Sequence, residues 1–290
     1  MMYRKKLLLT LSLFSLSSLW AVEIHPVHSS IEGYYEFKIF TGSKQKTDGR
    51  VLGIGADIHN GRSEYRFAYE KGFTNTLQPP LDKDLKTDKL FLKYAYRFDE
   101  AWEGQVHYIN ILNDNIAITD GGAVYGLGLN KVFSKKLNGD FTQYFTHYND
   151  FNVYQSDLRL SYSTRIQDVK VKFSSLTKYI SIDTLHANSF TKNAQDEYLT
   201  TSLQIQAHYN TYHLAGVAYI GERLFAVMND GFKIQHHSME FKKTYAVSAG
   251  KRIGNMVVRL QYIYQEATEL PLSNENVKLR NTRVLLNYKF

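Results

Sequence analysis

Residues 278–290 read KLRNTRVLLNYKF, and their side chains alternate in character along the segment. One set holds Val284, Leu286, Tyr288 and Phe290, and the set between them holds Arg283, Leu285, Asn287 and Lys289. Successive side chains of a β-strand point to opposite faces, so this period of two predicts a strand with one apolar face. The end of the chain therefore predicts a sheet whose two faces meet different surroundings.

The same alternation recurs from residue 31 onward. In residues 255–268, Leu260, Tyr262 and Tyr264 share one face, while Arg259 and Gln261 share the other. Aromatic residues make up 14% of the chain and Pro numbers only 4, which suits strands because Pro cannot donate to a sheet ladder. The pattern predicts strands at 31–42, 50–60, 63–73, 89–98, 101–112, 122–133, 139–148, 151–164, 168–182, 195–209, 211–222, 238–253, 255–268 and 278–290, with a bulge near Ser174-Ser175.

The connections between these strands alternate in length. Those after even-numbered strands are tight turns, and most of those after odd-numbered strands are longer and polar. Transmembrane barrels have short turns at one end and longer loops at the other, and closure leaves no unpaired strand edge in hydrocarbon. The predicted fold class is all-β: a transmembrane antiparallel up-and-down β-barrel of about 14 strands, with 12 or 16 as neighbouring alternatives. A soluble β-sandwich is the alternative architecture.

The N-terminus predicts export. Arg4, Lys5 and Lys6 precede an apolar run over residues 7–20, and Ala21 supplies a small residue for cleavage. We therefore expect a signal peptide at 1–21, a short N-terminal segment at 22–30 and the barrel at 31–290. Removing residues 1–21 takes away three positive charges, so the net charge falls from +7 to +4, which gives no support for nucleic-acid binding. The absence of Cys excludes disulfides, thiolate metal sites and a lipoprotein anchor.

The export signal, the alternating strands and the terminal aromatics resemble Gram-negative outer-membrane β-barrel proteins of the porin-like kind. The resemblance implies location in the cell outer membrane, contact with membrane lipid and lipopolysaccharide, and recognition of Tyr288 and Phe290 by the barrel assembly machinery as an insertion signal. Leu285 departs from the small residue common in that signal. The resemblance identifies no subfamily and no oligomeric state.

The face opposite the aromatic one carries eleven bases against six acids. Burying so many charges in a dry core is costly unless all are paired, so a water-filled lumen is expected. The sequence predicts a porin-like channel for passive diffusion of small hydrophilic solutes, with anion preference. Residues 74–88, which contain Pro79-Pro80, are expected to narrow the pore of this channel. The predicted pore-lining bases are Arg66, Lys93, Arg97, Arg159, Lys170, Lys172, Arg252, Arg259 and Arg283. Under the alternative interpretation, these bases pair with lumen acids and only stabilise the wall.

Two other functions stay open at this point. His236 and Ser238 have the spacing at which a strand places a base and a nucleophile on one face, as in barrel enzymes that act on lipid. A structural or adhesive barrel without transport is the other alternative. The histidines are dispersed and no phosphate-binding loop is present, so the sequence predicts neither a metal nor another cofactor.

Overall fold

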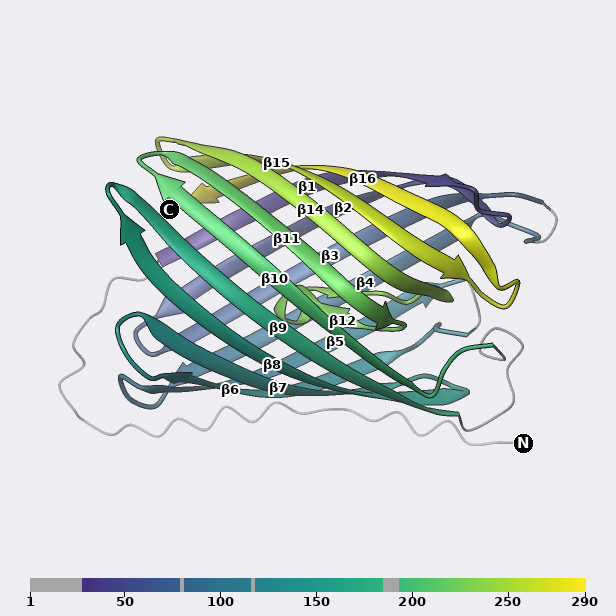
Figure 1. Ribbon diagram of the computed structural model, residues 1–290, viewed down its shortest axis with the longest axis horizontal. Coiled ribbons are helices and arrows are strands. Elements are labelled where there is room, and N and C mark those ends of the chain that lie inside the picture. The colour runs from purple at the N-terminus through teal and green to yellow at the C-terminus, as the bar shows by residue number, and fades with distance from the viewer. Residues whose placement is uncertain (1–27, 79–80, 116–117, 185–192) are drawn as a thin grey trace, which may run out of the picture.

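The computed structural model describes residues 28–78, 81–115, 118–184 and 193–290. The predicted signal peptide lies outside these residues. Fourteen antiparallel strands form a closed barrel (Figure 1), which confirms the predicted fold class and strand number. The barrel strands are β1 (His28–Thr41), β2 (Lys46–Asn60), β3 (Ser63–Thr76), β4 (Leu85–Arg97), β5 (Trp102–Asp114), β6 (Ala123–Val132), β7 (Leu137–His147), β8 (Phe151–Ile166), β9 (Val169–Thr184), β10 (Glu197–Tyr209), β11 (Tyr212–Arg223), β14 (Met239–Ile253), β15 (Met256–Glu269) and β16 (Asn274–Lys289).

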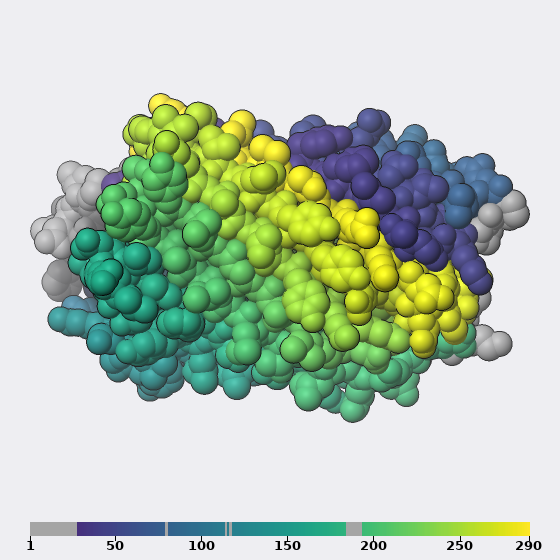
Figure 2. Space-filling model, turned by 45° about the horizontal axis from the view of Figure 1, so that its top comes forward, coloured from purple at the N-terminus to yellow at the C-terminus, as the bar shows by residue number. Residues whose placement is uncertain are grey.

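The barrel closes between its first and last strands. β1 pairs with β16 over a ladder that runs from Ser30 opposite Lys289 to Thr41 opposite Lys278. Figure 2 shows the two strands side by side on the outer surface, β1 in purple and β16 in yellow. Because every strand of the barrel has two neighbours, the barrel sheet presents no open edge to its surroundings.

The alternation read from the sequence places apolar side chains outside and polar ones inside. On β10, Leu203 points outward with 66% of its surface exposed, while Gln204 lines an internal cavity. Tyr35 on β1 and Tyr262 on β15 are likewise exposed on the outside. An apolar outer band around a polar interior is the arrangement of barrels that sit in lipid.

Strand ends differ from the sequence prediction at one end of the barrel. β2 begins at Lys46 rather than at 50, and β16 begins at Asn274 rather than at 278. The longer connections therefore contain fewer residues than predicted, because polar side chains continue the ladders beyond the apolar band. The turns at 61–62, 98–101, 133–136, 167–168, 210–211 and 254–255 define the short-turn end, where β1 begins and β16 finishes; the opposite end is the long-loop end.

The bulge predicted near Ser174-Ser175 is wrong. Both residues lie in uninterrupted ladders with β8 and β10. A register shift occurs instead between Ile220 and Arg223 on β11, next to Gly221 with φ of 101°. A Cβ at Gly221 would lie 2.3 Å from the backbone oxygen of Leu199, so this position requires glycine.

Between β11 and β14 the chain forms β12 (Val227–Met228), the short 3₁₀ helix η1 (Asn229–Gly231) and β13 (Lys233–Ile234). β12 and β13 form a separate two-stranded sheet. Among the described residues, no helix has the length and apolar character needed to cross a membrane.

Candidate functional site

Residues 224–238, named here the inward segment, fold into the barrel instead of extending away from it. Figure 1 shows β12 and the adjoining coil inside the ring of strands. The segment leaves the wall after Arg223 and returns at Met239, and Arg223 pairs with Phe241 across neighbouring strands. The interior of the barrel is therefore defined jointly by the wall and by this segment.

An ion pair fixes the turn of the inward segment to the wall. Asp230 accepts hydrogen bonds from Nη1 and Nη2 of Arg159 on β8, with 3.0 Å between Nη1 and Oδ2. Two parallel charge-assisted bonds fix orientation as well as distance. Asp230 thus anchors the turn midway along β8.

Buried polar contacts hold the β12 part of the segment. Gln155 donates from Nε2 to the Val227 oxygen at 2.9 Å and accepts from the Val227 nitrogen at 2.8 Å. Lys178 Nζ donates to the same Val227 oxygen at 2.9 Å and to Asp157. These wall side chains take the place of a neighbouring strand for the backbone of Val227.

Apolar contacts close part of the interior at the long-loop end. Leu224 and Phe225 are fully buried, and the Phe225 ring lies 4.7 Å from that of Phe151 and 5.7 Å from that of Tyr148. This cluster also takes in Phe91 and Ile109 from the wall. A second apolar cluster lies nearby between β1, β14, β15 and β16 and holds Phe40, Met239, Phe241, Ala267, Val277 and Leu279. At this end of the barrel, packed apolar side chains therefore occupy part of the space that was expected to be a water-filled lumen.

The β13 part of the segment meets a second charge network. Lys233 Nζ lies 3.5 Å from Glu36 on β1, and Glu36 also accepts from Arg283 Nε at 2.8 Å. Next to this pair, Lys89 Nζ lies 2.9 Å from Glu70. The inward segment is thus held from two opposite sides of the wall.

The tight turn of the segment depends on a run of positive φ angles. Asn229, Asp230 and Gly231 have φ of 51°, 54° and 84°. A Cβ at Gly231 would lie 2.4 Å from Nδ1 of His107. Asn and Asp tolerate this left-handed region better than most residues. Gly231 has no Cβ and therefore leaves room for the ring of His107.

A cavity of about 520 Å³, named here the central cavity, lies between the inward segment and the wall. The wall strands around it include β9, β10, β11, β14 and β15. Its lining includes one acid, Asp230, and seven bases: Arg66, Arg159, Lys172, Arg223, Lys233, Arg259 and Arg283. Positively charged side chains on the wall of a confined space raise the local concentration of anions.

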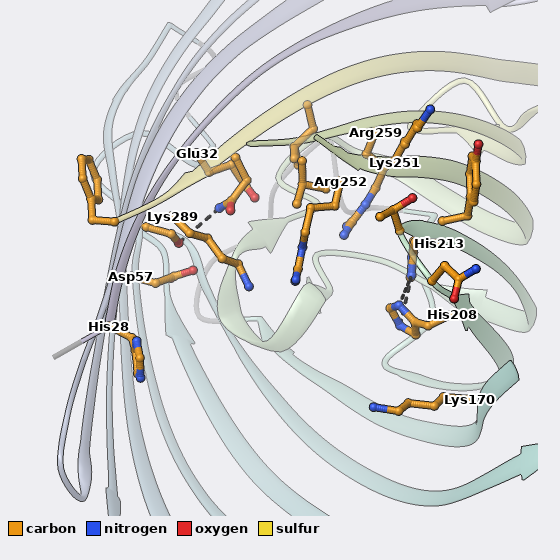
Figure 3. Close-up of a pocket in the computed structure, with 18 of the residues that line it drawn as sticks. His28, Glu32, Asp57, Lys170, His208, His213, Lys251, Arg252, Arg259 and Lys289 are labelled. Carbon is orange, nitrogen blue, oxygen red and sulfur yellow. Dashed lines mark hydrogen bonds between the residues drawn. The ribbon is translucent and has the colours of Figure 1, made fainter. Parts of the chain in front are cut away.

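A second cavity of about 890 Å³, the short-turn cavity, lies at the end of the barrel where β1 begins. Figure 3 shows Glu32 and Asp57 on one side, facing Lys170, Arg252 and Arg259 across the space. His208 and His213 also lie on the basic side, with ring nitrogens 3.2 Å apart. Arg259 lines both cavities, so the two are neighbours along the lumen.

Eight of the nine predicted pore-lining bases lie on the walls of internal cavities. The central cavity contains Arg66, Arg159, Lys172, Arg259 and Arg283, the short-turn cavity contains Lys170, Arg252 and again Arg259, and a smaller cavity of about 120 Å³ contains Lys93. Arg97 lines none of the cavities described here; its side chain is largely exposed and lies 3.7 Å from Glu103. Several of the bases are paired with acids, as the alternative interpretation expects, which leaves their role in the lumen a prediction.

The sequence predicts strands at 211–222 and 238–253 and no element between them, so Arg223, Asp230 and Lys233 were not among the predicted lumen residues. The signal that could have found them is the apolar run Leu224–Met228, which is unusual in a connection at the long-loop end. The connection expected to narrow the pore is shorter than predicted, since β3 continues to Thr76 and β4 begins at Leu85; the narrowing itself stays a prediction. Pro79-Pro80 lie outside the described residues.

His236 lines a cavity of about 60 Å³ inside the barrel with Glu36 and Lys89, away from the lipid-facing surface that a lipid-cleaving site would need.

Tyr288 and Phe290 lie at the short-turn end, exposed, with their rings edge to face at 5.1 Å. Their reading as an insertion signal stays a prediction. Among the described residues, no group of three or more His, Cys, Asp or Glu side chains could hold a metal ion.

Comparison with known proteins supports the architecture. No protein-family model matches the sequence, and no curated protein matches it. Among solved structures, a bacterial polysaccharide outer membrane secretin is similar with a TM-score of 0.53 and 8% identity, over 91% of this chain and 98% of the other. The Acinetobacter baumannii outer membrane protein Omp33 is similar with a TM-score of 0.50 and 7% identity, over 91% and 99%. The NanC porin gives a TM-score of 0.48 and 11% identity, over 90% and 100%. At such identities the likeness concerns the fold, which is that of outer-membrane β-barrels.

Proposed function

We propose that the protein is an outer-membrane channel for passive diffusion of small hydrophilic solutes, and that it prefers anions. The fold favours a place in the outer membrane, with the short-turn end in the periplasm and the apolar band in contact with lipid and lipopolysaccharide. The observation that carries the anion preference is the lining of the central cavity, where seven bases accompany one acid.

Salt bridges to these bases do not cancel the surplus of positive charge on the wall of the central cavity. Arg66 lies 2.5 Å from Asp57, Arg159 pairs with Asp230, and Arg283 pairs with Glu36. Lys172 and Arg259 have no salt bridge among the described residues. The unpaired bases leave a positive wall opposite the inward segment, and such a wall attracts anions into a narrow passage.

Passage toward the long-loop end requires the inward segment to move. Its apolar residues, with Phe225 at their centre, fill that end of the interior against Tyr148 and Phe151. Much of the rest of its attachment is ionic or polar, through Asp230, Val227 and Lys233. We propose that this segment is the barrier that limits conduction.

Reversal potentials in planar bilayers under a KCl gradient test the proposal. The purified protein should give a potential that reports chloride preference. Arg259→Glu should shift the potential toward potassium, because it reverses a charge on both cavity walls. Arg97→Glu is the matched control, since it makes the same charge change on an exposed side chain outside the described cavities.

Two outcomes would contradict this function. One is potassium preference in the unaltered protein, or equal shifts from the two variants, either of which removes the anion preference. The other is the absence of any conductance both in the unaltered protein and in a variant that lacks the inward segment, which removes the channel itself.

A further inference from the structure

Arg223 is a buried cation without a counter-ion. It lies at the end of β11 with 0% of its surface exposed, and it lines the central cavity with Thr244 and Gln265. Its guanidinium carbon lies 5.0 Å from the ring centre of Tyr219 and 5.5 Å from that of Phe241. The two rings fix the orientation of the guanidinium group.

Two of the three guanidinium nitrogens have no partner. Nη2 donates to the hydroxyl oxygen of Thr244, while Nε and Nη1 are buried and make no hydrogen bond. A buried donor without an acceptor is strongly unfavourable, and more so when it carries charge. The site is therefore incomplete as the chain alone builds it.

Three of the other four arginines that line this cavity differ in this respect, and Arg259 is the exception. Arg66, Arg159 and Arg283 each have a carboxylate within salt-bridge distance. No carboxylate among the described residues lies within that distance of Arg223. The charge of Arg223 is thus balanced by no carboxylate among the described residues.

Thr244 adds a further donor at the same place. Its hydroxyl oxygen accepts from Arg223 Nη2 and, at 3.1 Å, from Gln265 Nε2. With both acceptor positions of that oxygen engaged, the Thr244 hydroxyl hydrogen remains available to donate. The Gln235 Oε1 atom, which has no partner either, belongs to the same cavity lining but is neutral and does not compensate the charge.

We infer that Arg223 and Thr244 form a binding site for one compact anion, a halide or a small carboxylate, at the wall of the central cavity. Nε, Nη1 and the Thr244 hydroxyl supply the donors, and the Tyr219 and Phe241 rings restrict the site to an ion that fits between them and the inward segment. The inference deepens the proposed function and rests on it in one respect, namely that anions from solution reach the central cavity.

Bromide is a suitable probe because its anomalous scattering locates it in a crystal. Crystals of the unaltered protein soaked in sodium bromide should show an anomalous peak within hydrogen-bond distance of Arg223 Nε and Nη1. Arg223→Met should abolish this peak, and Met fits between aromatic rings without a charge. Arg252→Met, in the short-turn cavity, is the matched control and should leave the peak in place.

Thermal unfolding in detergent gives a second measurement. The unaltered protein should unfold at a higher temperature in bromide than in the same concentration of gluconate, an anion too large for the site. Arg223→Met should weaken the apparent affinity for bromide at least about tenfold, or abolish the difference, because charge-assisted hydrogen bonds are lost.

The inference is overturned if bromide-soaked crystals of the unaltered protein show no anomalous peak at Arg223, with Nε and Nη1 bonded to water or to Gln235 instead. It is also overturned if Arg223→Met keeps the bromide-dependent stabilisation in full. Failure of the proposed function is distinguishable, because a potassium-preferring or silent barrel that still shows bromide at Arg223 leaves this site intact.

Discussion

Asp230 and Arg159 are 71 residues apart in sequence and form a two-bond ion pair inside the barrel. The pair joins the turn of the inward segment to β8. Because Asp230 is also the acid in a cavity lined by seven bases, it has two effects: it holds the segment in place, and it lowers the positive charge of the passage.

The first prediction concerns this carboxylate. Asp230→Asn removes the ion pair and one negative charge, so single-channel conductance should rise and chloride preference should increase. Recordings in planar bilayers check both quantities. Glu100→Gln, in an exposed turn at the short-turn end, makes the same charge change away from the cavities and should alter neither. Unchanged conductance in Asp230→Asn would mean that the turn does not limit conduction.

The second prediction concerns the whole inward segment. Arg223 pairs with Phe241 on the neighbouring strand, so a short Gly-containing turn can replace residues 224–238 without stretching the wall. This variant should conduct more than Asp230→Asn does, because the apolar packing around Phe225 is lost as well. Retained resistance to detergent on unheated gels would verify that the barrel is closed. A conductance equal to that of the unaltered protein would place the barrier elsewhere.

The third prediction tests which face meets lipid. Leu203→Arg on the outer face of β10 should destabilise the barrel by about 2–4 kcal/mol, the cost of Arg near the bilayer midplane. Gln204→Arg, one residue further along and facing the central cavity, should cost far less. Reversible unfolding from lipid vesicles in denaturant measures both. Similar costs for the two variants would contradict the assignment of faces.

The fourth prediction concerns pH. Burial, with the repulsion of Arg283 and Lys38, outweighs the attraction of Glu36 and Glu70 and lowers the pKa of Lys233 to about 8. As pH rises through that value, Lys233 loses its charge, so chloride preference should fall between pH 7 and 9. The folded barrel binds this proton less tightly than the unfolded chain, whose Lys titrates near 10.5, so the free energy of unfolding should rise from pH 8 toward 10.5.

Lys233→Met removes the titrating group and is the comparison for that measurement. The reversal potential of this variant should not change in a step near pH 8. Its dependence on the KCl gradient should otherwise stay the same, because the remaining bases keep their charge. A step of equal size in Lys233→Met would assign the titration to another group.

The wall of the barrel could be predicted from the sequence because its rule is local. Neighbours such as Leu203 and Gln204 face lipid and lumen in turn, and that contrast repeats along each strand. The ends of the strands were harder to predict from the sequence. Polar residues such as Lys46 and Asn274 extend the ladders where the two faces no longer differ in environment.

The candidate site was only half predictable for a different reason. Arg159 and Arg283 could be placed in the lumen from strand parity, but their partners Asp230 and Glu36 could not be assigned to them. The path of residues 224–238 is set by contacts such as Phe225 with Phe151 and Val227 with Gln155, between positions about 70 residues apart. No periodic pattern records such contacts, so this part of the interior had to come from the structure.

The return of the chain to an adjacent strand after the inward segment has an evolutionary consequence. Insertions, deletions or wholesale replacement between Arg223 and Met239 leave all fourteen strand pairings of the barrel untouched. Descendants of one barrel can therefore acquire new permeability by exchanging a single internal stretch, while the shell that faces the membrane is inherited without change.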